Sequence, residues 1–246
     1  MKIILAETVL HKPHLETTGE LALRFKENKN NIVKFIYLGN NLLWNDWQFP
    51  LFNKLLGFSH DKRITLFKKI LEDNEIKILQ ENKFDDFKKD KILNWSRKFK
   101  GDLNELKNIK YKNTPIGNSI LSSLISYHRD FNLDINLHRT KVQQMLYSAV
   151  IILKRSELLI KLEKPDQIVT FNGRFSISNP IIAAAKKFRI PVLAYQVSGE
   201  YSLISSAIQK KLINDYAVYE SLVAFKRAGA NAIVSYYADR LDKILI

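Results

Sequence analysis

The sequence contains no cysteine, which excludes disulfides, thiolate metal sites and cysteine nucleophiles together. No run approaches the 18 apolar residues that suggest a transmembrane helix. The amino terminus offers only residues 3–6 as an apolar stretch before Glu7, too short for the core of a signal peptide. Internal repeats and low-complexity linkers are also missing. We therefore expect a cytoplasmic protein without a membrane segment.

Hydrophobic residues make up 46% of the 246 residues, enough to bury a core as one large domain or two small ones. The formal net charge is +14, and residues 191–246 hold 6 basic and 5 acidic side chains, so nearly all of the excess belongs to residues 1–190. One interpretation is attraction to phosphates in nucleic acid, nucleotide sugars or an anionic membrane. The other is a lysine-rich composition with solvated helix surfaces, and no nucleic-acid motif accompanies the charge.

Short apolar runs alternate with helical patterns along the chain, which indicates a parallel sheet with helices on both faces. We predict an α/β protein with a Rossmann-like sheet. The expected strands are Lys2–Glu7, Ile32–Leu38, Gln167–Phe171, Val192–Val197 and Ala232–Tyr236. All five are expected in one sheet, because isolated strands would leave backbone groups unpaired.

Helix signals fill the spaces between these runs. Thr17 and Glu20 have capping-box spacing, and a long apolar stripe predicts a helix over Lys141–Glu163. Further helices are expected from an Asn179 N-cap and from an Asp215 N-cap to Gly229. Residues 44–111 are predicted to be helical, with these apolar side chains buried: Leu66, Ile70, Phe84, Phe87, Ile92, Trp95 and Phe99. Their interleaving with lysines also permits single-stranded nucleic-acid binding.

Two segments near the carboxyl end, VLAYQVSGEY at residues 192–201 and AFKRAGANAIVSYYADRLDKIL at residues 224–245, resemble the last part of delta-aminolevulinate dehydratase, also called porphobilinogen synthase. That resemblance implies the last two strands of a (β/α)8 barrel for residues 191–246 and a helix between them. It also implies hydrolyase chemistry of tetrapyrrole (heme) biosynthesis, in which two 5-aminolevulinate molecules condense. By the same resemblance, Ser198 and Tyr236 bind a substrate carboxylate.

The dehydratase family holds its substrates through Schiff bases to two lysines on earlier strands, and residues 1–190 do not match those segments. Lys164 precedes the strand Gln167–Phe171, so it is expected at the wrong end of the sheet. The zinc or magnesium ligands of the family are not found either, and no other cofactor is evident. We therefore expect the chain to be inactive alone in this condensation.

A second resemblance lies in residues 1–190 and is carried by four segments: HKPHLETTGELALRF, YLGNNLLWNDW, IGNSILSSLIS and EKPDQIVTFNGRFS. They are similar to the first half of surface or capsule polysaccharide biosynthesis proteins, which are glycosyltransferase-like. Such chemistry needs a base for the acceptor hydroxyl, and His11, His14 and Glu16 are candidates. Arg174 is a candidate phosphate ligand. His11 and His14 also have the spacing of metal ligands, although no third partner is apparent and a polar loop is the alternative.

Two functional classes stay open for this chain. One is an enzyme, related either to porphobilinogen synthase or to a sugar transferase. The other is a non-catalytic chimeric or truncated chain whose two pieces, residues 1–190 and 191–246, each lack part of an active site. The expected ligands are a small carboxylate or a sugar phosphate, no specific nucleic acid is expected, and the oligomeric state is open.

Overall fold

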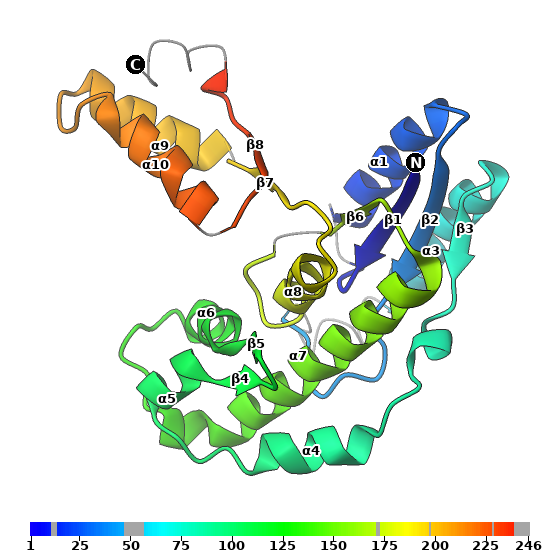
Figure 1. Ribbon diagram of the computed structural model, residues 1–246, viewed down its shortest axis with the longest axis horizontal. Helices are drawn as coiled ribbons and strands as arrows, with labels where there is room; N and C mark the ends of the chain where they lie inside the picture. Colours follow the sequence, from blue (N-terminus) through cyan, green and yellow to red (C-terminus); the bar gives the residue numbers. More distant parts are fainter. Residues whose placement is uncertain (11–13, 47–56, 171–172, 197, 228, 239–246) are drawn as a thin grey trace. The chain divides into compact units, whose positions relative to one another are not determined.

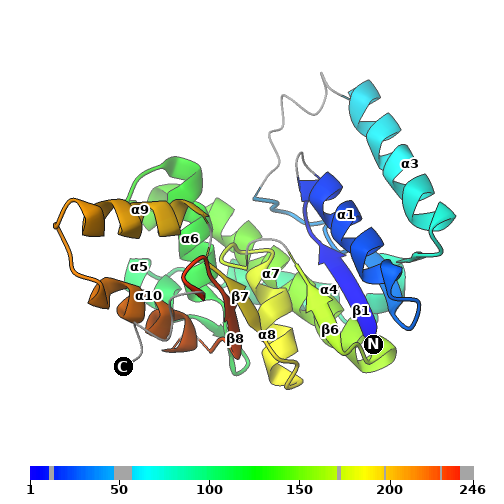
Figure 2. The same cartoon turned by 90° about the horizontal axis from the view of Figure 1, so that it is seen from above.

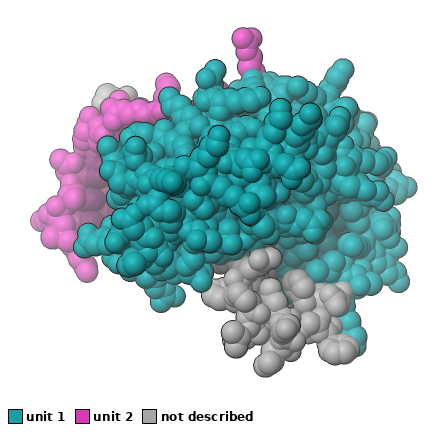
Figure 3. All heavy atoms as spheres, turned by 90° about the horizontal axis from the view of Figure 1, so that it is seen from below, with its two compact units in different colours: residues 1–188 teal, residues 189–246 magenta. Residues whose placement is uncertain are grey.

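A computed structural model describes residues 1–10, 14–46, 57–170, 173–196, 198–227 and 229–238. The chain divides into two compact units, Met1–Phe188 (unit 1) and Arg189–Ile246 (unit 2), which Figure 3 colours separately. The predicted α/β class is confirmed, since each unit holds parallel strands and helices.

Unit 1 is built on a four-stranded sheet in which every neighbouring pair is parallel. In spatial order the strands are β3 (Lys77–Leu79), β2 (Ile32–Tyr37), β1 (Lys2–Glu7) and β6 (Gln167–Val169). The described α-helices of unit 1 are α1 (His14–Glu27), α3 (Gly57–Asp73), α4 (Lys89–Arg97), α5 (Leu103–Asn108), α6 (Gly117–His128), α7 (Ile135–Glu163) and α8 (Asn179–Lys187). A short 3-10 helix, η1 (Glu81–Phe84), and a two-stranded ribbon of β4 (Lys110–Tyr111) and β5 (Thr114–Pro115) also belong to it.

Both faces of the sheet are covered by helices (Figures 1 and 2). Successive residues of a strand point to opposite faces. Accordingly Leu5 packs in a cluster with residues of α1 and α3, whereas Ile4 packs with residues of α7 and α8. Because both faces of β1 are buried, its sequence is a continuous apolar run at residues 3–6, which is typical of a strand in a parallel sheet.

A further apolar cluster lies away from the sheet, among α4, α5, α6 and the first half of α7. The long α7 contributes to this helical cluster through Val142 and, through Leu159, to the cluster on the sheet face covered by α7 and α8. Its predicted stripe is confirmed: Val142, Met145, Ala149, Leu153 and Ile160 are all buried.

Unit 2 holds a separate two-stranded parallel sheet, β7 (Leu193–Tyr195) and β8 (Ala232–Val234). Two helices connect these strands, α9 (Ser198–Gln209) and α10 (Tyr216–Arg227). The small core of the unit contains Val218, Leu222 and Tyr237.

Several sequence predictions are wrong in detail. A single sheet shared by all strands is not formed, because β7 and β8 pair with each other and form a sheet of their own. Helix α9 was not predicted, nor was β3. Helix α1 begins at His14, so Thr17 lies inside it and does not cap it. Helix α7 begins at Ile135, before the predicted Lys141.

Two side chains predicted to be buried, Leu66 and Ile70, are exposed on α3. The apolar stripe of α3 uses Phe67 and Leu71 instead, which pack on the sheet face covered by α1 and α3. The N-cap of α8 is Ser178, one residue before the predicted Asn179. Among the described residues no helix is both long and apolar enough to cross a membrane.

Candidate functional site

The carboxyl ends of β1, β2 and β6 meet at one edge of the sheet of unit 1, because these strands are parallel. From β1 the chain moves outward to β2 and β3, and it returns to β6 on the other side of β1. Open parallel sheets bind ligands at such a switch point, beyond the carboxyl ends of the strands. The edge that holds the end of β1 and the start of the loop after β6 is therefore the first candidate site.

Glu7, the last residue of β1, is a buried carboxyl group at this edge, with 2% of its surface exposed. The hydroxyl of Thr18 in α1 donates to Glu7 Oε1 at 2.8 Å, and Oε2 has no hydrogen-bond partner within the described structure. Burial raises the pKa of Glu7 to about 8, although the Thr18 hydrogen bond acts in the opposite direction. Glu7 therefore carries a proton at neutral pH. Sequence reasoning treated it only as the end of a buried strand.

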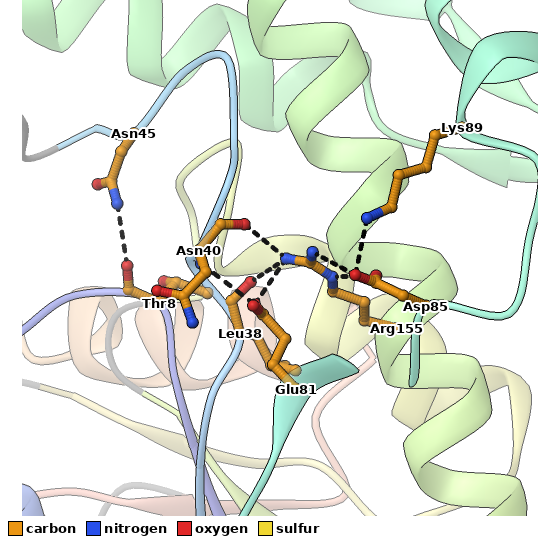
Figure 4. A network of polar contacts seen from close by, with 8 residues as sticks. All are labelled: Thr8, Leu38, Asn40, Asn45, Glu81, Asp85, Lys89 and Arg155. Carbon is orange, nitrogen blue, oxygen red and sulfur yellow. Dashed lines mark hydrogen bonds and ion pairs between the residues drawn. The ribbon is translucent and has the colours of Figure 1, made fainter. Parts of the chain in front are cut away.

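The loop after β2 is held in place by polar contacts with Arg155 of α7 (Figure 4). The side chain of Arg155 is fully buried. Its Nη1 donates to the carbonyl oxygens of Leu38 at 2.8 Å and Asn40 at 2.9 Å. The same nitrogen lies 2.6 Å from Glu81 Oε1, and Nε lies 2.7 Å from Asp85 Oδ1. One guanidinium thus joins α7, η1 and the start of the β2 loop.

The two carboxylates that face Arg155 respond differently to burial. Burial raises the pKa of Glu81 above its ordinary value, and Arg155 offsets only part of this effect. Burial also acts to raise the pKa of Asp85, but hydrogen bonds from Arg155 and Lys89 outweigh it and lower that pKa. With every charge partnered, this cluster stabilises the edge and offers no free group for catalysis.

His14 and Glu16, the candidate bases, lie in the first turn of α1. Glu16 Oε1 is 2.6 Å from Arg63 Nη2 of α3, so its carboxylate joins the two helices. His14 is half-buried, and His11 lies outside the described residues. The role of these residues as a base stays a prediction.

Arg174 follows β6 in the loop that leads to α8. Its guanidinium lies 4.5 Å from the centre of the Phe175 ring, and Nη2 is 3.5 Å from Ser126 Oγ of α6. Arg174 belongs to the sheet of unit 1, whereas Ser198 and Tyr236 belong to the sheet of unit 2. The prediction that all three emerge at one edge of a common sheet is therefore wrong.

Lys164 ends α7 with a left-handed backbone (φ 47°), and its N–H donates to the Ile160 carbonyl. Two residues later the Asp166 N–H donates to the Lys2 carbonyl, at the start of β1. Lys164 is thus at the amino edge of the sheet, as predicted, opposite the candidate site.

The second candidate site is the carboxyl edge of the β7–β8 sheet in unit 2. Ser198 opens α9 three residues after β7 ends, and Tyr236 comes two residues after β8. Because β7 and β8 are parallel neighbours, both residues lie at the same edge. Ser198 is exposed and Tyr236 is 50% exposed, with the Tyr236 ring centre 5.2 Å from that of Tyr201.

A buried polar framework supports this edge. Gln196 is fully buried; its Nε2 donates to Ser221 Oγ at 2.6 Å and its Oε1 accepts from Ser235 Oγ at 2.5 Å. The hydroxyl of Tyr237, 3% exposed, is 2.7 Å from Ser205 Oγ. These contacts fix the turn that presents Tyr236. Sequence reasoning did not single out Gln196 or Tyr237, since neither belongs to a charged or repeated pattern.

The described residues hold no group of three or more metal-ligating side chains. The sequence has no cysteine to bind such an ion, and the expectation that the zinc or magnesium ligands of the dehydratase family are missing stays a prediction.

Comparison with known proteins identifies one family in the carboxyl-terminal region. The family model "Delta-aminolevulinic acid dehydratase" matches residues 178–244, starting earlier than the predicted residue 191. The enzyme of that name from Methanothermobacter thermautotrophicus is 46% identical over 56 residues, which are 23% of this chain and 17% of the relative. The Bradyrhizobium diazoefficiens enzyme is 50% identical over 54 residues, 22% of this chain and 15% of the relative.

A longer match, to the Streptomyces coelicolor enzyme, is 38% identical over 90 residues, covering 36% of this chain and 27% of the relative. The chain thus matches less than a third of the length of these relatives. None of these matches names a glycosyltransferase, so that resemblance of residues 1–190 stays a prediction. No solved structure matches the chain.

Proposed function

We propose that unit 2 binds the carboxylate of a small keto acid of the 5-aminolevulinate type. In this proposal the chain is porphobilinogen synthase-like in carrying the carboxylate-binding part of that site, and it does not carry out the condensation by itself. One observation supports the proposal most: Ser198 and Tyr236 lie at the carboxyl ends of two neighbouring parallel strands, inside the region that the dehydratase model matches.

The chemistry of this edge suits a carboxylate. Hydroxyl groups donate hydrogen bonds to an anion without adding a charge of their own. Ser198 and Gly199 also open α9, and the first N–H groups of a helix favour a negative charge. Apart from its chain neighbours and its own helix backbone, no heavy atom of the described residues lies within 4 Å of the position that a Cβ at Gly199 would take, which leaves space for a ligand beside Ser198.

Condensation of 5-aminolevulinate requires a lysine amine beside the substrate ketone. Lys226 of unit 2 lies in the last turn of α10, which leads into the start of β8 and hence to the opposite edge of that sheet. Lys164 of unit 1 is likewise at the amino edge of its own sheet. We therefore propose binding without Schiff-base formation.

The test is a titration of the full chain with 5-aminolevulinate, followed by the amide NMR signals of unit 2. We expect saturable shifts, no binding of 1-amino-2-butanone, which is the same amino ketone without the carboxylate, and weaker binding by Ser198→Ala and Tyr236→Phe. Tyr216→Phe is the matched control, because Tyr216 is an exposed tyrosine of α10. Unchanged affinity in both site variants would refute the carboxylate site.

Borohydride treatment in the presence of 5-aminolevulinate separates binding from catalysis. We expect no covalent adduct and no porphobilinogen. A stoichiometric lysine adduct accompanied by product would overturn the claim that the chain lacks the condensation chemistry, whereas it would leave the carboxylate site standing.

A further inference from the structure

A cavity of about 550 Å³ opens in unit 1 along the outer face of α6. Its wall follows helical spacing, with Asn118, Leu121, Ser122, Ile125 and Arg129 on one side of the helix. The opposite side of α6, which carries Ile120 and Leu124, is buried in the helical cluster. The burial of one face therefore leaves the other face free to line a site.

Two guanidinium groups line this cavity, one from Arg129 and one from Arg174. No carboxylate lines it, and within the described residues neither arginine forms an ion pair. Asp130, next to Arg129 in sequence, accepts the Asn132 N–H at 2.8 Å. Two positive groups without a carboxylate partner make the cavity attractive to an anion.

The geometry of the cavity is fixed by the surrounding backbone. Arg129 ends α6 in a left-handed conformation (φ 55°), so the chain turns there. The loop that carries Arg174 is tied to α6, because the Ser176 N–H donates to the buried Ser123 Oγ at 2.8 Å. The stack of Arg174 on Phe175 further restrains its guanidinium. The backbone of both arginines is thus positioned before any ligand binds, and the guanidinium of Arg174 is restrained as well.

Besides the polar Asn118, Ser122 and Ser126, the rest of the lining is apolar. Leu121 and Ile125 contribute aliphatic surface from α6, and Phe131 lies at the border with 81% of its surface exposed. Small-molecule sites typically combine such apolar walls with a few polar groups and enclose about 300–1,000 Å³. The cavity lies within this size range.

We propose that this cavity binds a phosphomonoester with an apolar body. The phosphate lies between Arg129 and Arg174 and accepts from the Ser122 and Ser126 hydroxyls, while the apolar body covers Leu121, Ile125 and Phe131. Arginine suits this task because its planar group donates two parallel hydrogen bonds to phosphate oxygens. The site lies within unit 1 and is independent of the carboxylate site proposed for unit 2.

Phenyl phosphate is a direct probe, with inorganic phosphate and phenol as the two halves of the ligand. Titration calorimetry on the full chain should give at least tenfold tighter binding of phenyl phosphate than of either half. Equal affinity for inorganic phosphate would overturn the apolar part of the proposal, and absence of phenyl phosphate binding would overturn the whole.

Three variants locate the site. Arg129→Gln and Arg174→Gln should each weaken binding about tenfold or more, as expected for the loss of a charged hydrogen bond. Arg97→Gln removes an equal charge from an exposed end of α4 and should leave affinity unchanged. An equal loss in Arg97→Gln would show that net charge alone attracts the ligand.

Ser126→Trp fills the cavity and removes no charge. Ser126 is exposed on α6, so the larger side chain does not enter the core. Binding should be lost while the unfolding midpoint stays unchanged. Retained binding in this variant would place the ligand elsewhere and refute the site.

Discussion

Arg155 and Asp85, 70 residues apart in the sequence, form a two-pronged ion pair in which Nε lies 2.7 Å from Oδ1 and Nη2 3.0 Å from Oδ2. The remaining nitrogen of Arg155 reaches the backbone of the loop after β2 and Glu81. A buried arginine in this position links α7 and Asp85 to the carboxyl edge of the sheet of unit 1.

Arg155→Met should reduce the free energy of unfolding of unit 1 by about 3–5 kcal/mol, because it leaves two carboxylates and two carbonyl oxygens without their partner. All three tryptophans of the chain belong to unit 1, so tryptophan fluorescence during urea unfolding follows this unit alone. Arg24→Met, which removes an arginine from an exposed ion pair with Glu20, is the control and should change little. A similar loss in both variants would contradict the special role of Arg155.

Glu7→Gln should change how stability depends on pH. Below pH 4.5 both the folded and unfolded states hold the Glu7 proton, and between 4.5 and about 8 only the folded state holds it. The free energy of unfolding therefore falls with rising pH in this window, by up to about 1.4 kcal/mol per pH unit, and levels off above it.

The Gln variant cannot ionise, so its free energy of unfolding should not fall in this pH window. Relative to the wild type, the variant should therefore become more stable as pH rises. Urea unfolding followed by tryptophan fluorescence at several pH values between 4.5 and 8 measures the difference. Glu20→Gln, on the exposed surface of α1, should keep the wild-type slope. A wild-type slope retained in Glu7→Gln would show that Glu7 does not hold the proton.

Strong local patterns explain which parts of the fold were predicted from the sequence. β1 and β2 are apolar runs with both faces covered, and α7 carries an uninterrupted stripe, so each element was found. β3 was missed because it has three residues and starts with an exposed lysine at the sheet border. Its pairing with β2 depends on tertiary contacts that a local pattern does not contain.

The error of the single sheet has a different cause. The prediction assumed that Val192–Val197 and Ala232–Tyr236 needed the first sheet to satisfy their backbones. Instead the two strands satisfy each other, and the Gln196 N–H extends the pairing by donating to the Val234 carbonyl at 2.9 Å. Pattern analysis found the strands and their parallel direction, but it could not choose their partners.

The sequence predicted some residues of the candidate sites and missed others. Ser198 and Tyr236 were selected by resemblance, and their place at the ends of strands follows from local patterns. Glu7 and Arg155 were missed, because an ionisable residue within an apolar segment looks the same in sequence whether it is buried or at a surface. Only the packing of distant elements shows the difference.

Gly117→Ala tests the packing that supports the outer face of α6. An added methyl group would lie 2.0 Å from the Leu106 carbonyl oxygen and 2.6 Å from that of Lys107, both of them backbone atoms that move little. We expect roughly 1–3 kcal/mol of lost stability, as for overpacked sites. The urea midpoint of unit 1 measures this, and an unchanged midpoint would contradict the close approach of α5 and α6.

We expect different roles for the adjacent residues Tyr236 and Tyr237: ligand binding for Tyr236 and stabilisation of the fold for Tyr237. Tyr237→Phe removes the buried hydroxyl that pairs with Ser205 Oγ, and it should lower the free energy of unfolding of unit 2 by about 1 kcal/mol. Tyr236 is half exposed, so Tyr236→Phe should leave stability nearly unchanged while it weakens carboxylate binding.

Amide hydrogen exchange measures this pair of variants, because unit 2 contains no tryptophan. The Gln196 amide, which is bonded across the β7–β8 sheet, should exchange several times faster in Tyr237→Phe and at the wild-type rate in Tyr236→Phe. Equally fast exchange in Tyr236→Phe and Tyr237→Phe would show that the Tyr236 hydroxyl supports the fold. Weaker ligand binding by the Tyr236→Phe variant would then not be evidence that this hydroxyl contacts a carboxylate.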